Sequence, residues 1–205
     1  ARIPNNAEVT HALSLTDPQL IELDPLICTV FLAKEGMKLD LGCLAKGYIA
    51  DKIADYLKSQ HVDSALINLG GNIKTIGANV LANRPWQIGI QNPRQPRGTN
   101  LAVLPISNQS VVTSGTYERK LQVNEHTYHH ILDRKTGYPV DTQLASITII
   151  SDNSLDGEIW TTRLYGEKPR QLLARVEQEK GIEAIIVTTD NRVYYSSGIS
   201  PEFLA

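Results

Sequence analysis

The sequence lacks the marks of a membrane-spanning or nucleic-acid-binding protein. No apolar run approaches the roughly 18 to 20 residues that a transmembrane helix needs, and the opening residues Ala1 to Pro4 do not resemble a signal peptide. The 20 basic and 22 acidic residues leave a net charge of −2, so no basic surface is available for nucleic acid. We therefore predict a water-soluble chain without a nucleic-acid partner.

Cysteine is also scarce, because the chain has only two, which excludes a disulfide framework. Cys28 follows Leu26-Ile27, and Cys43 lies between Gly42 and Leu44. These apolar surroundings predict two small buried thiols rather than a metal or redox pair.

The composition and periodicity predict one globular α+β domain over residues 1–205. Hydrophobic residues make up 41% of the chain and charged residues 20%. A helical period is clearest over 45–58, and further helices are expected over 155–165 and 169–180. Runs at 27–32 and 37–41 predict a hairpin around Lys34-Glu35-Gly36. Other strands are expected at 64–69, 73–76, 86–90, 101–106, 110–114, 120–123, 127–132, 145–151, 184–188 and 193–196.

Two glycine-containing segments could bind an anionic or flat ligand. Lys46 lies at the start of the first long helix, where backbone amides and an ammonium suit a phosphate, although an ordinary helix entrance with a solvated lysine is equally compatible. Asn68-Leu69-Gly70-Gly71 follows a buried strand and permits close approach of a ligand; the alternative is a tight turn between strands.

Two further segments carry reactive side chains. In Ser114 to Arg119, the guanidinium of Arg119 could bind an anion or could form a surface salt bridge with Glu118. His129 and His130 are adjacent, and on a strand they face opposite sides, which argues against a shared zinc ion. One neutral imidazole near a phosphate could serve as a general base, while a buried structural histidine is the alternative.

Hard oxygen ligands gather in a last segment. Asp156 and Thr161 offer a carboxylate and a hydroxyl, the ligand types that Mg²⁺ uses beside phosphates. Asp156 could instead simply cap a helix, in which case Glu158 is the next candidate carboxylate.

Taken in this order, the segments Asp40 to Tyr48, Asn68 to Gly71, Thr113 to Arg119 and His129 to Gly137 resemble the ApbE family of FAD:protein FMN transferases. The resemblance extends from about Met37 to Gly198. It implies a T-fold-like α+β architecture. It also implies a Mg²⁺-dependent transfer of FMN from FAD to a threonine hydroxyl of a target protein, with AMP as the leaving group.

The resemblance also implies residue roles. Lys46 would neutralise the pyrophosphate, and His130 and Asp156 would be catalytic, with His130 approaching the reacting phosphate. The metal ligands would be the backbone carbonyl of Cys43, Asp156 and Thr161, although Asp156 and Thr161 are five residues apart where the family motif has four. The FAD pocket would be lined by Lys46, Asn68, Gly70, Gly71, Ser114, Gly115, Thr116, Tyr117, Glu118, Arg119 and His130.

Two other functions are compatible with the same residues. One is a metal-dependent FAD pyrophosphatase that makes FMN and AMP, and the other is a flavin-nucleotide binding module without catalysis. By resemblance, the full-length protein would carry a further upstream segment and would be an extracytoplasmic lipoprotein, anchored to the membrane through a tether.

Overall fold

The computed structural model describes residues 2–115, 120–123 and 126–204, which divide into two compact units. The first is built from the described parts of Ala1–Leu41 and Arg119–Val140, and the second from those of Gly42–Glu118 and Asp141–Ala205. Within these described parts, no helix combines the length and the apolar character needed to span a bilayer.

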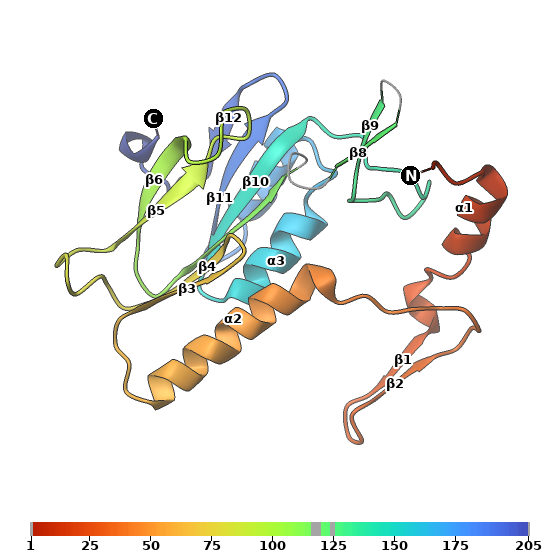
Figure 1. Ribbon diagram of the computed structural model, residues 1–205, viewed down its shortest axis with the longest axis horizontal. Helices are drawn as coiled ribbons and strands as arrows, with labels where there is room; N and C mark the ends of the chain where they lie inside the picture. The colour runs from red at the N-terminus through yellow and green to blue at the C-terminus, as the bar shows by residue number, and fades with distance from the viewer. Residues whose placement is uncertain (1, 116–119, 124–125, 205) are drawn as a thin grey trace. The chain divides into compact units, whose positions relative to one another are not determined.

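The first unit contains one helix, one 3₁₀ turn and two small antiparallel hairpins (Figure 1). Helix α1 (Asn6–Leu13) begins at Asn5, whose side chain accepts a hydrogen bond from the Glu8 amide at 3.0 Å while Glu8 accepts one from the Asn5 amide at 2.8 Å. This reciprocal cap satisfies amides that the helix itself cannot pair. The other elements are η1 (Pro18–Leu20), β1 (Ile21–Asp24), β2 (Thr29–Leu32), β8 (Lys120–Val123) and β9 (His126–His129).

The hairpin predicted from 27–32 and 37–41 was wrong, because β2 pairs with the preceding strand β1 and residues 37–41 form no strand. The chain turns earlier than expected, since the Asp24 carboxylate accepts hydrogen bonds from the amides of Leu26 at 2.9 Å and Ile27 at 3.3 Å. Cys28 lies in that turn with a φ of 53°. The prediction of buried cysteines was also wrong, because Cys28 and Cys43 are both exposed free thiols.

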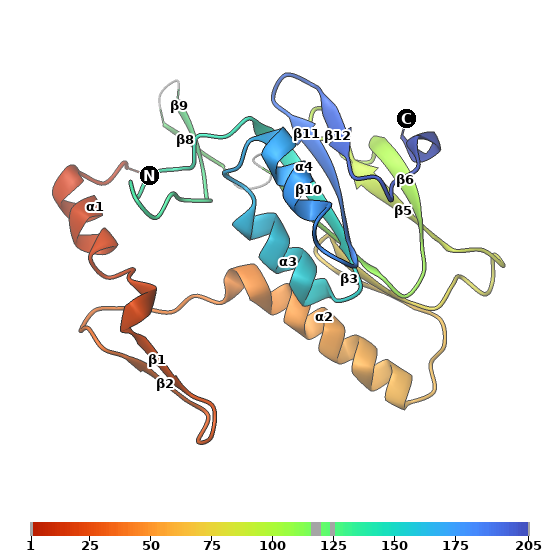
Figure 2. The same ribbon diagram turned by 180° about the vertical axis from the view of Figure 1, so that it is seen from behind.

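A six-stranded antiparallel sheet forms the centre of the second unit (Figures 1 and 2). Its strand order is β12-β11-β10-β7-β4-β3. Strand β10 (Leu144–Ser151) is buried along its whole length, as its run of β-branched residues predicts. The other strands are β3 (Ala65–Leu69), β4 (Asn72–Ile76), β7 (Ser110–Gly115), β11 (Ile182–Thr188) and β12 (Val193–Tyr195).

The two faces of this sheet are covered differently. Helices α2 (Gly42–Ser59), α3 (Ser154–Arg163) and α4 (Pro169–Val176) pack against the sheet, with α3 over β7 and β10 (Figure 2). The hairpin of β5 (Trp86–Gln91) and β6 (Asn100–Ile106) shares a hydrophobic cluster with Val111, whereas Gly157 of α3 lies against Val112. Neighbouring residues of a strand face opposite ways, so hairpin and helix lie on opposite faces. A 3₁₀ turn, η2 (Pro201–Phe203), follows β12. The predicted α+β class is confirmed, because helices and antiparallel sheets occur together here as in the similar solved structures.

Helices α2 and α3 touch through backbone at Gly47. A Cβ atom at this position would lie 2.6 Å from the carbonyl oxygen of Ser154 and 2.8 Å from the Cα of Leu155. Both obstacles are main-chain atoms and cannot rotate away, so only glycine permits this approach.

We expect Gly47→Ala to lower the free energy of unfolding by roughly 1–3 kcal/mol, because the added methyl group must push α3 away. Urea denaturation measures the change. Asp55→Ala is the matched control, since Asp55 is an exposed residue of α2 that forms an ion pair with Lys52, at 3.7 Å; it should change stability by less than about 0.5 kcal/mol. Equal stability of Gly47→Ala and wild type would contradict the close packing.

Candidate functional site

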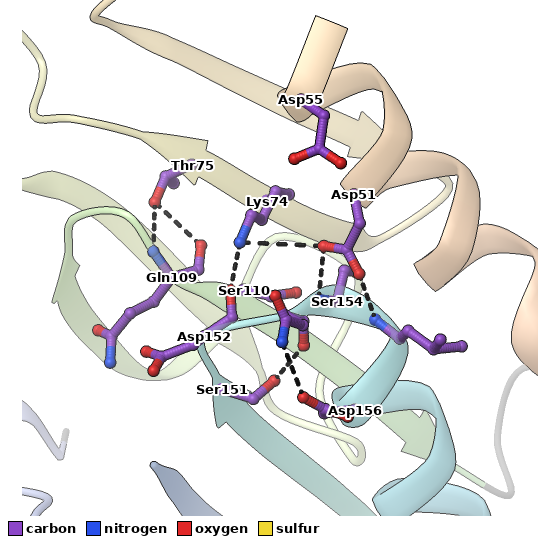
Figure 3. Close-up of polar contacts among 12 residues, drawn as sticks. Asp51, Asp55, Lys74, Thr75, Gln109, Ser110, Ser151, Asp152, Ser154 and Asp156 are labelled. Carbon is purple, nitrogen blue, oxygen red and sulfur yellow. Dashed lines mark hydrogen bonds and ion pairs between the residues drawn. The ribbon is translucent and has the colours of Figure 1, made fainter. Parts of the chain in front are cut away.

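A chain of buried polar contacts joins α2, α3 and β4 in the second unit. It begins at Asp51 of α2, whose two carboxylate oxygens accept hydrogen bonds from the amides of Ser154 at 2.8 Å and Leu155 at 2.9 Å (Figure 3). These amides open α3 and have no partner within the helix. Asp51 therefore caps α3 from a neighbouring helix, which is a long-range equivalent of an N-cap.

Lys74 of β4 faces the same carboxylate. Its side chain is 6% exposed, and its ammonium lies 3.9 Å from Asp51 and donates a hydrogen bond to the carbonyl of Asp152 (Figure 3). Burial lowers the pKa of Lys74 below its ordinary value of 10.5, and the charge of Asp51 partly opposes that shift. The ammonium thus fixes the start of α3 against β4.

A second ion pair continues the chain toward the surface. The buried carboxylate of Glu158 accepts a hydrogen bond from the Asn72 amide group at 2.9 Å and lies 3.3 Å from the ammonium of Lys46. The Asn72 carbonyl in turn accepts a hydrogen bond from the Ser154 hydroxyl at 2.6 Å. The two side chains of the pair differ in exposure, 6% for Glu158 and 48% for Lys46, so the carboxylate is held and the lysine is half in solvent.

Helix α3 presents Glu158, not Asp156, to this network. The buried residues of α3 are Ser154, Gly157, Glu158 and Thr161, which follow a helical period. Asp156 is only partly buried and accepts a hydrogen bond from the Asn153 side chain at 3.1 Å. Five residues correspond to about 140° around a helix, so Asp156 and Thr161 point in different directions. The predicted carboxylate and hydroxyl therefore do not share a face of α3.

Antiparallel packing brings other candidate ligands close to Glu158. Asp51 meets the beginning of α3, whereas Lys46, one turn nearer the start of α2, meets Glu158. The first turn of α2, with Cys43, therefore lies toward the end of α3, with Thr161 and Thr162. Thr161 is fully buried and donates to the Glu158 carbonyl at 3.1 Å. In the described part of the chain, no three His, Cys, Asp or Glu side chains form a metal-binding group.

The glycine turn between β3 and β4 leaves room for a ligand. Gly70 and Gly71 have φ values of 62° and 96°, and a Cβ at either position would meet no atom within 4 Å. Asn68 stabilises the turn by accepting a hydrogen bond from the Gly71 amide at 2.9 Å. Asn72 follows directly, so this open turn leads into the Glu158 network.

Strand β7 carries part of the predicted nucleotide segment. Ser114 is half-buried and pairs in register with Ile147, and Gly115 pairs with Ser146. Thr116, Tyr117, Glu118 and Arg119 lie outside the described residues. Their predicted part in the pocket stays a prediction.

The two histidines lie in the first unit and have different surroundings. The ring of His129 contacts the carbonyl of Val140 at 2.9 Å, and the ring nitrogen Nδ1 accepts from the Ile131 amide at 3.3 Å. His130 is exposed and lines a largely apolar hollow of about 470 Å³ together with Tyr138. The ring of His129 therefore takes part in the local structure, and both histidines line the hollow, where the side chain of His130 is the more exposed.

Sequence reasoning did not assign the buried network. Asp156 was the first carboxylate predicted in this segment, although its spacing to Thr161 departs from the family motif, and Glu158 was only the next candidate. The helical period could have identified Glu158 as the buried carboxylate. The buried residues of α3 are spaced three or four residues apart, at Ser154, Gly157, Glu158 and Thr161. For Asn72 and Lys74 no comparable signal exists, since polar residues in a strand usually face solvent.

Comparisons with known proteins agree in pointing to one family. A profile described as the ApbE family matches residues 1–186. A FAD:protein FMN transferase of Klebsiella pneumoniae is 47% identical over 195 residues, 95% of this chain and 60% of the relative, and one of Treponema pallidum is 35% identical over 97% of this chain and 58% of the relative. The chain thus spans about 60% of the length of these curated relatives.

Solved structures agree with these relatives. The crystal structure of the ApbE protein from Thermotoga maritima superposes with a TM-score of 0.87 at 29% identity, over all of this chain and 65% of that one. The flavin transferase ApbE from Vibrio cholerae gives a TM-score of 0.82 at 26% identity, again over all of this chain and 65% of that one.

The buried ammonium of Lys74 predicts a pH dependence of stability. Because its pKa is lower in the folded chain than in the unfolded chain, the unfolded chain binds more protons between the lowered pKa and 10.5. The free energy of unfolding of wild type, relative to Lys74→Met, should therefore rise with pH across this alkaline window. Urea denaturation from neutral to alkaline pH measures the difference, and a difference that is flat or falls with pH would contradict burial of the charged form.

Proposed function

The chain belongs to the ApbE family, and from this premise we propose that it takes part in the transfer of FMN from FAD to a threonine hydroxyl of a target protein, with release of AMP. The observation that carries the proposal is the pairing of half-exposed Lys46 with buried Glu158 at the entrance of α2, beside the open turn at Gly70 and Gly71. Relatives that match almost the whole chain carry the name FAD:protein FMN transferase.

The entrance of α2 suits a pyrophosphate for electrostatic reasons. The amides of the first turn of an 18-residue helix carry partial positive charge, and Lys46 adds a full charge nearby. The glycine turn offers space for the remainder of the nucleotide. We accordingly propose that Lys46, Asn68, Gly70 and Gly71 hold FAD, together with Ser114 to Arg119 as predicted from the family motif.

The residues around Glu158 fit Mg²⁺, because a carboxylate and threonine hydroxyls are the hard oxygen donors that this ion prefers. We propose Glu158 as the carboxylate, with Asp156, the carboxylate first predicted from the sequence, as the alternative. Thr161 is the predicted hydroxyl ligand. Thr162 is a second candidate, because it follows Glu158 by four residues, which places Glu158 and Thr162 on one side of α3. The backbone carbonyl of Cys43 remains the third predicted ligand. When bound, the ion would neutralise charge on the pyrophosphate.

His130 is proposed as the base that takes the proton of the acceptor threonine. Its exposed imidazole lines a hollow, and imidazole is the side chain that most often serves as a general base. The threonine oxygen would then attack the phosphorus atom on the FMN side, and the bond to AMP would break. Lys46 would stabilise the charge that develops on the phosphate oxygens.

A location is proposed on the family resemblance alone. We infer that the whole protein works outside the cytoplasmic membrane and is held there as a lipoprotein.

The central experiment supplies FAD, Mg²⁺ and a peptide with one threonine, and a peptide with alanine at that position is the control. We expect a flavin adduct on the threonine peptide alone, detected by mass spectrometry, with an equal amount of AMP. Free FMN without an adduct would favour a pyrophosphatase, and FAD binding without any product would favour a binding module.

Two carboxylate variants should separate the candidate metal ligands. We expect Glu158→Gln to lower the transfer rate by roughly 10² or more, because a carboxylate beside the ion contributes directly to charge stabilisation. Asp156→Asn, the matched control on the same helix, should retain activity within about threefold, the scale of a peripheral change. The opposite ranking, measured at several Mg²⁺ concentrations, would assign the ion to Asp156.

Substitution of His130 and of Lys46 should affect different steps. His130→Ala should lower transfer by roughly 10²- to 10⁴-fold, the usual contribution of one general base, with little change in FAD affinity. Lys46→Ala should weaken FAD binding as well, since its charge acts on bound substrate and transition state alike. Calorimetry gives the affinities. A parallel loss of FAD binding and transfer in His130→Ala would make His130 a ligand contact instead of the base.

A further inference from the structure

We propose that Lys46 closes a cation site at Glu158 and that a pyrophosphate-bearing ligand opens it by drawing Lys46 away, so that the divalent cation and the nucleotide bind cooperatively. This inference rests on the proposed function and adds a regulation of the same site. The regulation is that binding of the divalent cation and binding of the nucleotide depend on each other.

The carboxylate of Glu158 is held in one position by its neighbours. Glu158 accepts a 2.9 Å hydrogen bond from Asn72, which is itself held by the 2.6 Å bond from Ser154. The Glu158 and Asn72 side chains are almost fully buried. A carboxylate in such surroundings needs a positive partner, because an uncompensated buried charge is costly.

Lys46, the partner of this carboxylate, can move away from it. The ammonium of Lys46 lies 3.3 Å from Glu158, yet 48% of its side chain is exposed. The lysine side chain is long and flexible, and its charge is well solvated outside the pair. Lys46 is therefore the movable member of the pair, and Glu158 is the stationary one.

The ammonium of Lys46 and a divalent cation would compete for the carboxylate of Glu158. A divalent cation bound at Glu158 would repel an ammonium held 3.3 Å from the same carboxylate, so the ion must displace Lys46. A pyrophosphate at the entrance of α2 attracts the released ammonium and removes this obstacle. Binding of one ligand then favours binding of the other, and linkage makes the effect reciprocal.

The experiment measures Mn²⁺ binding to the 205-residue chain without nucleotide, by the electron paramagnetic resonance signal of the free ion. Without Lys46 as competitor, Lys46→Met and Lys46→Gln should bind Mn²⁺ more tightly than wild type, by roughly three- to tenfold for a partly exposed ion pair. Lys46→Arg keeps the charge and should bind as weakly as wild type. Lys52→Met is the matched control, because Lys52 is an exposed lysine of the same helix whose partner is Asp55; it should leave the affinity unchanged.

A second measurement adds FAD, with binding of Mn²⁺ to FAD alone subtracted. FAD should tighten Mn²⁺ binding more in wild type than in Lys46→Met, since only wild type has an ammonium to release. Equal or weaker binding of Mn²⁺ by both neutral variants, or an equal effect of FAD on wild type and Lys46→Met, would overturn the inference. Absence of Mn²⁺ binding in every protein would overturn it too. The transfer assay with the threonine peptide tests the proposed function separately, because transfer can proceed without this coupling.

Discussion

The interaction on which the second unit depends is the one between the carboxylate of Asp51 and the first two amides of α3. It joins two helices that are far apart in the sequence, and it does so where α3 has unpaired donors and a partial positive charge. Lys74 supports the same carboxylate from the sheet. These contacts fix the beginning of α3, and Gly47 lets α2 and α3 approach closely. As a result, Glu158 lies opposite Lys46. The geometry of the candidate site is therefore a consequence of a helix cap one turn away.

Much of this fold could be predicted where the local pattern and the tertiary packing agree. Helix α2 follows its apolar period, and β10 follows its β-branched run, because both are buried against several neighbours. The β1–β2 hairpin could not be predicted in the same way. Its turn is set by hydrogen bonds to the Asp24 side chain, whereas the sequence has a more obvious turn signal at Gly36. The cysteines were misjudged for a related reason: apolar neighbours in the sequence do not bury a residue that lies in a turn or on the outside of a helix entrance.

The candidate site could be predicted by region, but not atom by atom. The segments around Lys46, Asn68 to Gly71 and Asp156 were predicted from their glycines and charges. Glu158 was only the second candidate, because the helical period was not used to choose between the two carboxylates. A sequence motif fixes a carboxylate only to within one turn, and the packing against α2 decides which side of α3 is buried. Partners such as Asn72, which is 86 positions from Glu158, come together only through the sheet topology.

The charges of the network suggest why the nucleotide and the ion would arrive together. Two ammonium groups, Lys46 and Lys74, face two carboxylates, Glu158 and Asp51. The neutral residues Asn72 and Ser154 link the two pairs, because the Ser154 amide binds Asp51 and its hydroxyl binds Asn72, which in turn binds Glu158. The interior is thus balanced before any ligand binds. An ion alone would leave an excess of positive charge in this buried region, and a pyrophosphate alone would take Lys46 from Glu158 and leave a carboxylate uncompensated. Only the two ligands together restore the balance, so cooperative binding follows from the same electrostatics that stabilise the ligand-free fold.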